Sequence, residues 1–265
     1  MSGARAPEGT GGLPMRILRA TSFALLSVLV TGLLFVAACA GLVLDPVRGR
    51  VAHAVARAWG RAILAISGVT LVVQGLDRLT PSVPAVLMAN HGSYLDIPVL
   101  LVAFDGQLRI VARRTLIWLP FVGWFIYLGG HFMIDRDDPR QAKGLMDRIA
   151  ARMRRHGLSA VVYPEGTRSL DGRLGPLKTG AFYLPVSVGV AVQPVAILGT
   201  HAVLPKGQWF PLRGGKVTVR VGERLAMEGL EGSPGRKALA ERTRAALLAL
   251  GLEERAAPEA AGSSA

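Results

Sequence analysis

The longest apolar stretch of the chain lies near its N-terminus. The twenty-five residues from Ala20 to Leu44 carry no charged side chain. As a helix they would be ~37 Å long at ~1.5 Å per residue, enough to cross a hydrocarbon core of ~30 Å. Residues 47–66 follow with apolar and arginine positions at mixed helical spacing, which is typical of an interfacial helix. We therefore predict a two-helix membrane-anchoring segment over residues 16–68, after a disordered tail over residues 1–15.

Two features leave the nature of this segment open. Arg16 and Arg19 precede an apolar run that contains Cys39, a pattern that also resembles a lipoprotein signal peptide. We favour an anchor, because a mature exported domain would not need so apolar a body. The positive-inside rule gives no orientation, since basic residues also follow the run: Arg48, Arg50, Arg57 and Arg61.

From Thr70 onward, short apolar runs alternate with helical patterns, which indicates an α/β domain. We place this domain at residues 69–251 and a second disordered tail at residues 252–265. The expected strands are residues 70–74, 85–89, 108–112, 131–134, 160–163, 192–198 and 216–221. The expected helices are residues 138–156 and 233–250, each beginning near a proline and ending before a glycine.

The connection at residues 116–130 is unusually apolar and aromatic. One reading is a buried helix broken at Pro120 and Gly123. The reading that we prefer is a surface that contacts membrane or acyl chains, with Trp118, Trp124 and Tyr127 at headgroup depth.

The composition indicates which classes of partner the protein is expected to bind. Hydrophobic residues make up 51% of the chain, the mean hydropathy is +0.38 and the formal net charge is +13, so an anionic phospholipid membrane and phosphorylated ligands are the expected partners. Without a zinc-finger, helix-turn-helix or RNA-recognition pattern, no nucleic acid is expected. A single cysteine, Cys39, excludes an intrachain disulfide and a multi-cysteine metal site.

The first candidate site follows the apolar run 85–89. His91 stands in a turn with Gly92, and Asp96 lies five residues further on. If a helix begins near Ser93, Asp96 can fold back and accept a hydrogen bond from one ring nitrogen of His91, leaving the other to remove a proton. The alternative is that Ser93 and Asp96 form a capping box and His91 is an ordinary turn residue.

The second candidate site follows the run 160–163. Pro164 and Gly166 predict a tight turn that presents Glu165, Thr167, Arg168 and Ser169. A guanidinium with nearby hydroxyls suits a phosphate, and Glu165 suits a substrate hydroxyl or the steering of Arg168. The alternative is a surface turn with an internal ion pair. Arg136 follows another predicted strand, and Lys178 precedes a possible helix start that would favour anions.

In order and approximate spacing, four blocks resemble the motifs of the glycerolipid acyltransferases: His91-x4-Asp96, residues 130–136, residues 163–169 and residues 193–195. The bacterial 1-acyl-sn-glycerol-3-phosphate acyltransferase group is the nearest match. The resemblance implies a mixed, mostly parallel central sheet flanked by helices, at the cytoplasmic face of a bacterial inner membrane. It departs from the family in two places, Tyr163 for phenylalanine and His131 for a small or apolar residue.

The resemblance also implies a reaction, the transfer of a fatty acyl group from acyl-CoA or acyl carrier protein to the 2-hydroxyl of lysophosphatidic acid. His91 would then be the general base and Asp96 its orienting carboxylate. Residues matching acceptor-binding or positioning motifs are Arg136, Glu165, Gly166, Arg168 and Pro194. Neither a metal nor another cofactor is expected. Backbone amides near Ser93 are candidates for stabilising the oxyanion, and Ser93 as nucleophile is disfavoured because it lacks a Gly-x-Ser-x-Gly elbow.

Three rival functions have distinct signatures. An acyltransferase for another lysolipid, such as lyso-ornithine lipid, would not need a phosphate on its acceptor. A lipid hydrolase would release fatty acid without any acceptor. A membrane-binding module would keep its function after loss of His91.

Overall fold

The computed structural model describes residues 13–44, 50–80, 83–118, 122–128, 131–134, 139–211 and 213–255. The predicted tail at residues 1–15 lies mostly outside this part of the chain, as do residues 256–265 of the other tail. Residues 252–255 are described, and Glu254 forms a β-bridge with Leu174.

A seven-stranded sheet forms the centre of the domain, in the order β1-β7-β6-β2-β5-β3-β4. Its strands are β1 (Val69–Gln74), β2 (Val86–Ala89), β3 (Leu108–Arg113), β4 (Phe132–Ile134), β5 (Ser159–Val162), β6 (Val192–Leu198) and β7 (Gly215–Val221). Only the pairing of β6 with β7 is antiparallel, and the other neighbours run parallel. The predicted strands and the mixed, mostly parallel sheet are therefore confirmed.

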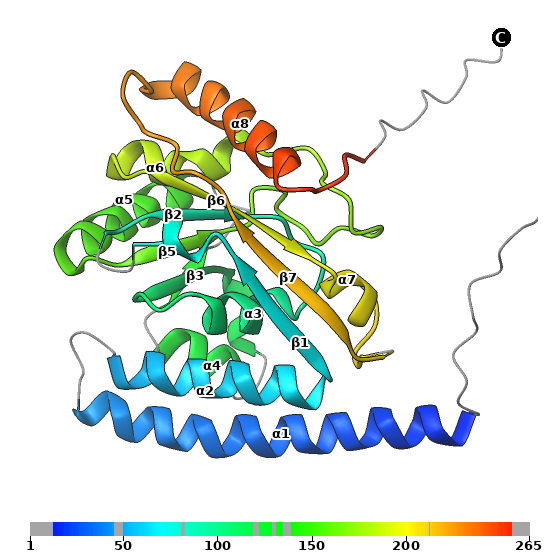
Figure 1. Ribbon diagram of the computed structural model, residues 1–265. Coiled ribbons are helices and arrows are strands. Elements are labelled where there is room, and N and C mark those ends of the chain that lie inside the picture. The colour runs from blue at the N-terminus through cyan, green and yellow to red at the C-terminus, as the bar shows by residue number, and fades with distance from the viewer. Residues whose placement is uncertain are drawn as a thin grey trace, which may run out of the picture.

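Helices cover both faces of this sheet (Figure 1). On one face lie α5 (Pro139–His156), α6 (Tyr183–Val188) and α8 (Gly232–Ala249), and on the other lie α2 (Arg50–Ile66), α3 (Asp96–Ala103) and α4 (Val122–Leu128). Shorter elements are α7 (Thr200–Val203) and the 3₁₀ turns η1 (Leu76–Arg78), η2 (Arg114–Trp118) and η3 (Thr179–Phe182). The helix expected after Lys178 thus begins as η3 and continues as α6.

Strand β2 shows why this sheet is a stable platform. Its four residues are all buried, and they alternate between two hydrophobic clusters, Leu87 and Ala89 on the α3 side, Val86 and Met88 on the α5 side. A continuous apolar run is what a central parallel strand needs, because both of its faces are covered. Each fully buried large side chain contributes about 1.5–3 kcal/mol to stability.

The N-terminal helix α1 (Leu13–Leu44) and α2 run side by side along the base of the molecule (Figure 1). Among the described helices, only α1 contains a segment, Ala20–Gly41, that is long and apolar enough to cross a membrane. Helix α2 instead packs between α1 and α3, and it buries residues such as Ala56 and Ile63. The structure therefore shows one apolar N-terminal helix, whereas the predicted anchoring pair is not shown, because the apolar side of α2 is used within the fold.

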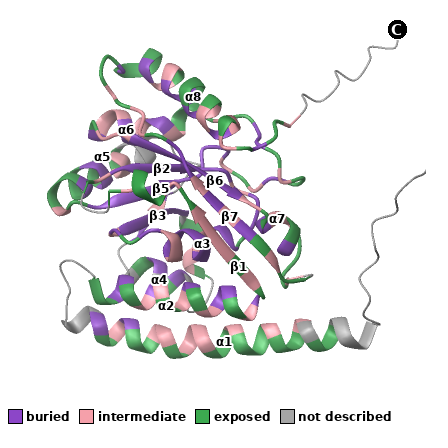
Figure 2. Cartoon of the chain, viewed as in Figure 1, coloured by how far each residue is buried: buried purple, intermediate pink, exposed green. Residues whose placement is uncertain are grey.

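The aromatic connection is partly exposed and partly buried, so its role at a membrane stays a prediction. Trp118, Trp124 and Tyr127 are exposed, as are large apolar side chains of α1, a helix that Figure 2 colours largely as exposed or intermediate. Ile126 is buried in the same helix, α4, and the ring of Phe35 on α1 lies 6.0 Å from that of Trp124. Residues 119–121 and 129–130 lie outside the described part.

Candidate active site

The candidate residues meet because three neighbouring strands end at one edge of the sheet. Strand β2 lies between β5 and β6 and runs parallel to both. The turn with His91 follows β2, the loop 163–169 follows β5, and α7 follows β6. In α/β folds, ligands bind at this carboxyl edge.

Asp96 organises the turn after β2. Its side chain is fully buried. Its Oδ2 atom accepts hydrogen bonds from Nδ1 of His91 at 2.8 Å and from the N–H groups of Gly92 at 2.8 Å and Ser93 at 2.9 Å. Its Oδ1 atom accepts one from the hydroxyl of Thr200 at 2.6 Å. Asp96 folds back as predicted, although α3 begins at Asp96 itself rather than near Ser93.

This arrangement fixes the state of the imidazole. In the neutral imidazole, Asp96 accepting at Nδ1 means that this nitrogen carries the proton and Nε2 has the free lone pair. Nε2 has no hydrogen-bond partner among the residues described here, and the side chain of His91 is 17% exposed. The geometry is that of a general base whose tautomer is set by a carboxylate.

Ser93 serves this turn as a structural residue. Its hydroxyl donates to the carbonyl of Leu204 at 2.7 Å and accepts from the N–H of Leu95 at 3.1 Å, and the residue is fully buried. A role as nucleophile is excluded by that engagement. The amides of Gly92 and Ser93 donate to Asp96, so these two N–H groups are already used within the turn.

Tyr163, at the end of β5, supports the imidazole from one face. Its ring stacks on that of His91 with centroids 4.1 Å apart and an interplanar angle of 17°. Its hydroxyl is buried and has no hydrogen-bond partner among the described residues. Burial, and then the charge of Asp96, raise the pKa of Tyr163 well above its ordinary value, so the phenol stays neutral.

Glu165 ties the loop after β5 to the catalytic turn. Its Oε1 atom accepts from the N–H of His91 at 2.9 Å, and Oε2 accepts from that of Gly175 at 2.9 Å. Burial raises the pKa of this carboxyl, against the lowering effect of both hydrogen bonds. Glu165 forms no ion pair with Arg168, so neither the steering role nor the internal ion pair of a plain surface turn is seen.

Ser169 is similarly used within the fold. Its N–H donates to the carbonyl of His91 at 2.6 Å, and its hydroxyl donates to Asp171 at 2.8 Å. Arg255, from the segment after α8, donates to both Ser169 and Asp171. The pKa of Asp171 lies well below its ordinary value, chiefly because Arg255 donates a hydrogen bond to the carboxylate.

Arg168 lies over the catalytic turn. Its guanidinium carbon is 3.6 Å from the ring centroid of Tyr94, three residues after His91 in the chain. Its Nη1 atom is buried without a hydrogen-bond partner in the described structure. A cation held by an aromatic face, with donors still unused, is suited to an anionic ligand.

The other predicted binding residues differ in their exposure. Thr167 and Lys178 are exposed on the same loop region. A Cβ at position 166 would lie 3.2 Å from the Cδ, Cε and Nζ atoms of Lys178, so Gly166 leaves room for that side chain. Pro194 is buried inside β6, opposite Met88 of β2, so it supports the sheet beneath the turn. Arg136 lies outside the described residues.

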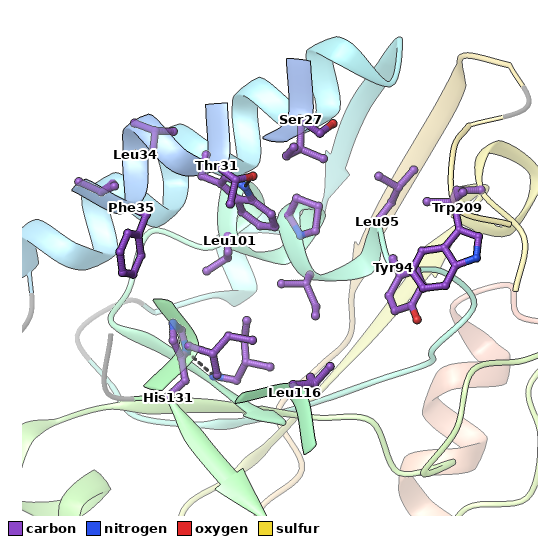
Figure 3. Close-up of a pocket in the computed structure, with 18 of the residues that line it drawn as sticks. Ser27, Thr31, Leu34, Phe35, Tyr94, Leu95, Leu101, Leu116, His131 and Trp209 are labelled. Atoms are coloured by element: carbon purple, nitrogen blue, oxygen red, sulfur yellow. Dashed lines mark hydrogen bonds between the residues drawn. The ribbon is translucent and has the colours of Figure 1, made fainter. Parts of the chain in front are cut away.

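An apolar cavity of ≈ 440 Å³ opens beside this turn. It runs from Tyr94 and Trp209 toward Phe35 and His131 (Figure 3). Helix α1 contributes one face, with side chains at helical spacing: Phe23, Ser27, Thr31, Leu34 and Phe35. Burial, and then the charge of Arg109, lower the pKa of His131 to about 3, so the imidazole in this wall is neutral.

Several of these residues were not found by sequence reasoning. Thr200, Arg255 and Trp209 come from segments far along the chain, and no local motif marks them. Tyr94 stands inside the predicted turn, and its aromatic side chain next to His91 was the one available signal.

The chain is similar in sequence to known acyltransferases. Residues 70–198 match the sequence model of the family described as Acyltransferase. The chloroplastic 1-acyl-sn-glycerol-3-phosphate acyltransferase of Arabidopsis thaliana is 35% identical over 179 residues, which cover 67% of this chain and 49% of that protein. The 1-acyl-sn-glycerol-3-phosphate acyltransferase of Haemophilus influenzae is 30% identical over 145 residues, which cover 55% of this chain and 59% of that one. The chain thus spans about half the length of the curated relatives that it matches.

The fold also has a solved counterpart. The crystal structure of the 1-acyl-sn-glycerophosphate acyltransferase from Thermotoga maritima superposes with a TM-score of 0.69 at 24% identity, over 90% of this chain and 98% of that one. At this identity the likeness establishes the fold.

Proposed function

We propose that this protein, whose residues 70–198 match the acyltransferase family model, transfers a fatty acyl group to the 2-hydroxyl of lysophosphatidic acid. The product would be phosphatidic acid for phospholipid biosynthesis, and the donor a thioester of coenzyme A or acyl carrier protein. The observation that carries the proposal is the position of Arg168 on Tyr94, in the same turn as the His91–Asp96 pair. The proposed base and the proposed phosphate-binding cation would then act on the same short lipid headgroup.

The reaction follows from the tautomer of His91. Nε2 removes the proton of the acceptor hydroxyl while its oxygen attacks the thioester carbonyl, and Asp96 stabilises the imidazolium that forms. When the tetrahedral intermediate collapses, the carbon–sulfur bond breaks and the imidazolium returns its proton to the leaving thiolate. Base assistance of this kind contributes about 10²–10⁴-fold, and alignment of the two substrates contributes much of the rest. Neither a metal nor a covalent enzyme intermediate is required.

The apolar cavity is the proposed site for an acyl chain. It begins at Tyr94, the residue that also carries Arg168, so the polar and apolar ends of a lipid would meet at this ring. Trp209 lies beside it with ring centroids 6.4 Å apart and forms the other side of the entrance. The neutral state of His131 keeps the far wall compatible with a hydrocarbon chain.

Helix α1 is the proposed attachment to the membrane. One side lines the cavity, while the other exposes apolar side chains such as Leu25, Leu29 and Val36. Because α1 packs along α2, we propose that it enters one leaflet and lies against the domain. The membrane would be a bacterial inner membrane with anionic lipids, and the domain would face the cytoplasm, where thioester donors are made.

A transfer assay with the purified chain tests this proposal. It uses a radiolabelled acyl donor with lysophosphatidic acid, with lyso-ornithine lipid and with no acceptor. We expect a labelled product with lysophosphatidic acid and little free fatty acid without acceptor. Faster acylation of lyso-ornithine lipid would assign a different acceptor, and release of fatty acid without acceptor would indicate a hydrolase.

A further inference from the structure

The segment between α7 and β7 brings a further cation to the loop after β5. Lys206 lies in this segment, and its Nζ atom donates to the hydroxyl of Thr167 at 3.2 Å and to the carbonyl of Arg168 at 3.0 Å. Both acceptors are neutral. An ammonium group has three N–H donors, so one donor remains for a ligand at this loop.

The carboxylates near this loop are engaged elsewhere. Glu165 accepts hydrogen bonds from backbone amides, and Asp171 is paired with Arg255. In the described part of the chain, neither Arg168 nor Lys206 forms an ion pair with a carboxylate. The positive charges of these two residues are therefore not neutralised by any residue that the structure describes, and the side chain of Lys178 passes over Gly166 on the same loop.

We propose that Lys206 is a specificity-determining residue of the acceptor site, which selects lysolipids with a phosphate monoester over those with a phosphodiester. A monoester carries about −1.5 to −2 charges near neutral pH, whereas a diester carries only one. Two or three cations on one loop favour the more highly charged group, because each added point charge interacts with the whole phosphate. This inference rests on the proposed function and assigns its headgroup preference to one residue.

A merely structural role for Lys206 makes a different prediction. If it only ties the β6–β7 connection to the 167–168 loop, its removal lowers stability and impairs every acceptor alike. If its charge acts on the headgroup, its removal changes KM for one class of acceptor and leaves kcat in place.

The test uses the full chain in neutral detergent micelles, with lysophosphatidic acid and lysophosphatidylglycerol as acceptors. The variants are Lys206→Met, Lys206→Arg and, as a matched control, Lys237→Met, which removes an exposed charge on α8. Loss of one charge-assisted hydrogen bond predicts a roughly tenfold higher KM for lysophosphatidic acid in Lys206→Met. We expect a change below about twofold for lysophosphatidylglycerol, a similar kcat, and recovery in Lys206→Arg.

Two outcomes overturn the inference at different levels. If wild type acylates lysophosphatidic acid and Lys206→Met raises its KM no more than Lys237→Met does, or raises both acceptor KM values equally, Lys206 does not select the headgroup. If wild type does not acylate lysophosphatidic acid, the proposed function fails and this inference fails with it. Thermal unfolding of each variant shows whether a lost activity reflects lost folding instead of lost selection. If Lys206→Met does not fold, Lys206→Arg is used instead: wild-type KM for lysophosphatidic acid supports a role of the charge, and a raised KM for both acceptors contradicts it.

Discussion

The turn after β2 and the loop after β5 lie against each other, but their charged side chains differ: the carboxylate of the turn has partners within the protein, whereas the cations at the loop have no carboxylate partner among the described residues. In the turn, the carboxylate of Asp96 accepts four hydrogen bonds, one of them from His91. Its negative charge is therefore balanced by donors of the protein itself. In the loop, Arg168 has no carboxylate partner among the described residues, and neither has Lys206, which reaches the loop from the segment between α7 and β7. A hydrogen-bond network in which every acceptor is used fixes one geometry and one tautomer. A cation without a carboxylate partner can instead form its ion pair with an anionic ligand. Catalysis and binding should therefore separate in mutants.

The largest effect is expected from His91→Ala. The variant loses the base but leaves three hydrogen-bond donors on Asp96, so the turn should stay folded. We expect kcat to fall by about 10²–10⁴-fold with little change in acceptor KM. Initial rates with lysophosphatidic acid measure this, and His156→Ala on α5 is the control. A variant that keeps more than a tenth of wild-type kcat would show that His91 is not the base.

Arg168→Ala should produce the reverse pattern. A hydrogen bond to a charged group contributes about 1.5–3 kcal/mol, so KM for lysophosphatidic acid should rise about 10- to 100-fold. We expect kcat at saturation to change by less than about threefold, because the His91–Asp96 pair is untouched. The control is Arg242→Ala, at an exposed position on α8. An equal loss of kcat in the Arg168 variant would mean that the two regions act as one unit.

Tyr163 tests how far the catalytic turn depends on shape alone. Its hydroxyl is buried and unpaired, so Tyr163→Phe should raise the free energy of unfolding by about 1 kcal/mol and leave kcat unchanged. Tyr163→Leu removes the ring that stacks on His91 and should lower kcat several-fold. Urea unfolding and initial rates check both variants. A tenfold loss of kcat in Tyr163→Phe would give the hydroxyl a role in the reaction.

The same contrast explains what the sequence could predict. His91 and Asp96 were found as a pair because both partners lie within one turn, where five-residue spacing and a glycine restrict their geometry. The strands were found because central parallel strands are apolar on both faces. Thr200 and Lys206 were not found, because local spacing does not tell which distant segment will meet a loop. Glu165 was recognised as important, but a residue type does not reveal which donors it will face.

The smallest effect is expected from Asp171→Asn, which tests the clamp that keeps the binding loop in shape. Asp171 accepts hydrogen bonds from Arg255 and from Ser169, and its pKa lies below the ordinary value of 3.8. A depressed carboxyl pKa means that the contact stabilises the folded state above about pH 4 and that this contribution is lost as the pH falls further. For an exposed pair the contribution is about 0–1 kcal/mol.

Thermal unfolding at pH 7 and at pH 2, well below the ordinary carboxyl pKa, should therefore show a small difference between wild type and variant that shrinks in acid. Asp77→Asn, at an exposed position in η1, serves as the control. The clamp meets the turn of His91 only through the backbone N–H of Ser169, which Asp171→Asn leaves in place, so KM for lysophosphatidic acid should rise by at most about fivefold while kcat stays constant. A fall in kcat instead would show that the clamp supports the catalytic turn and would remove the separation between the two regions.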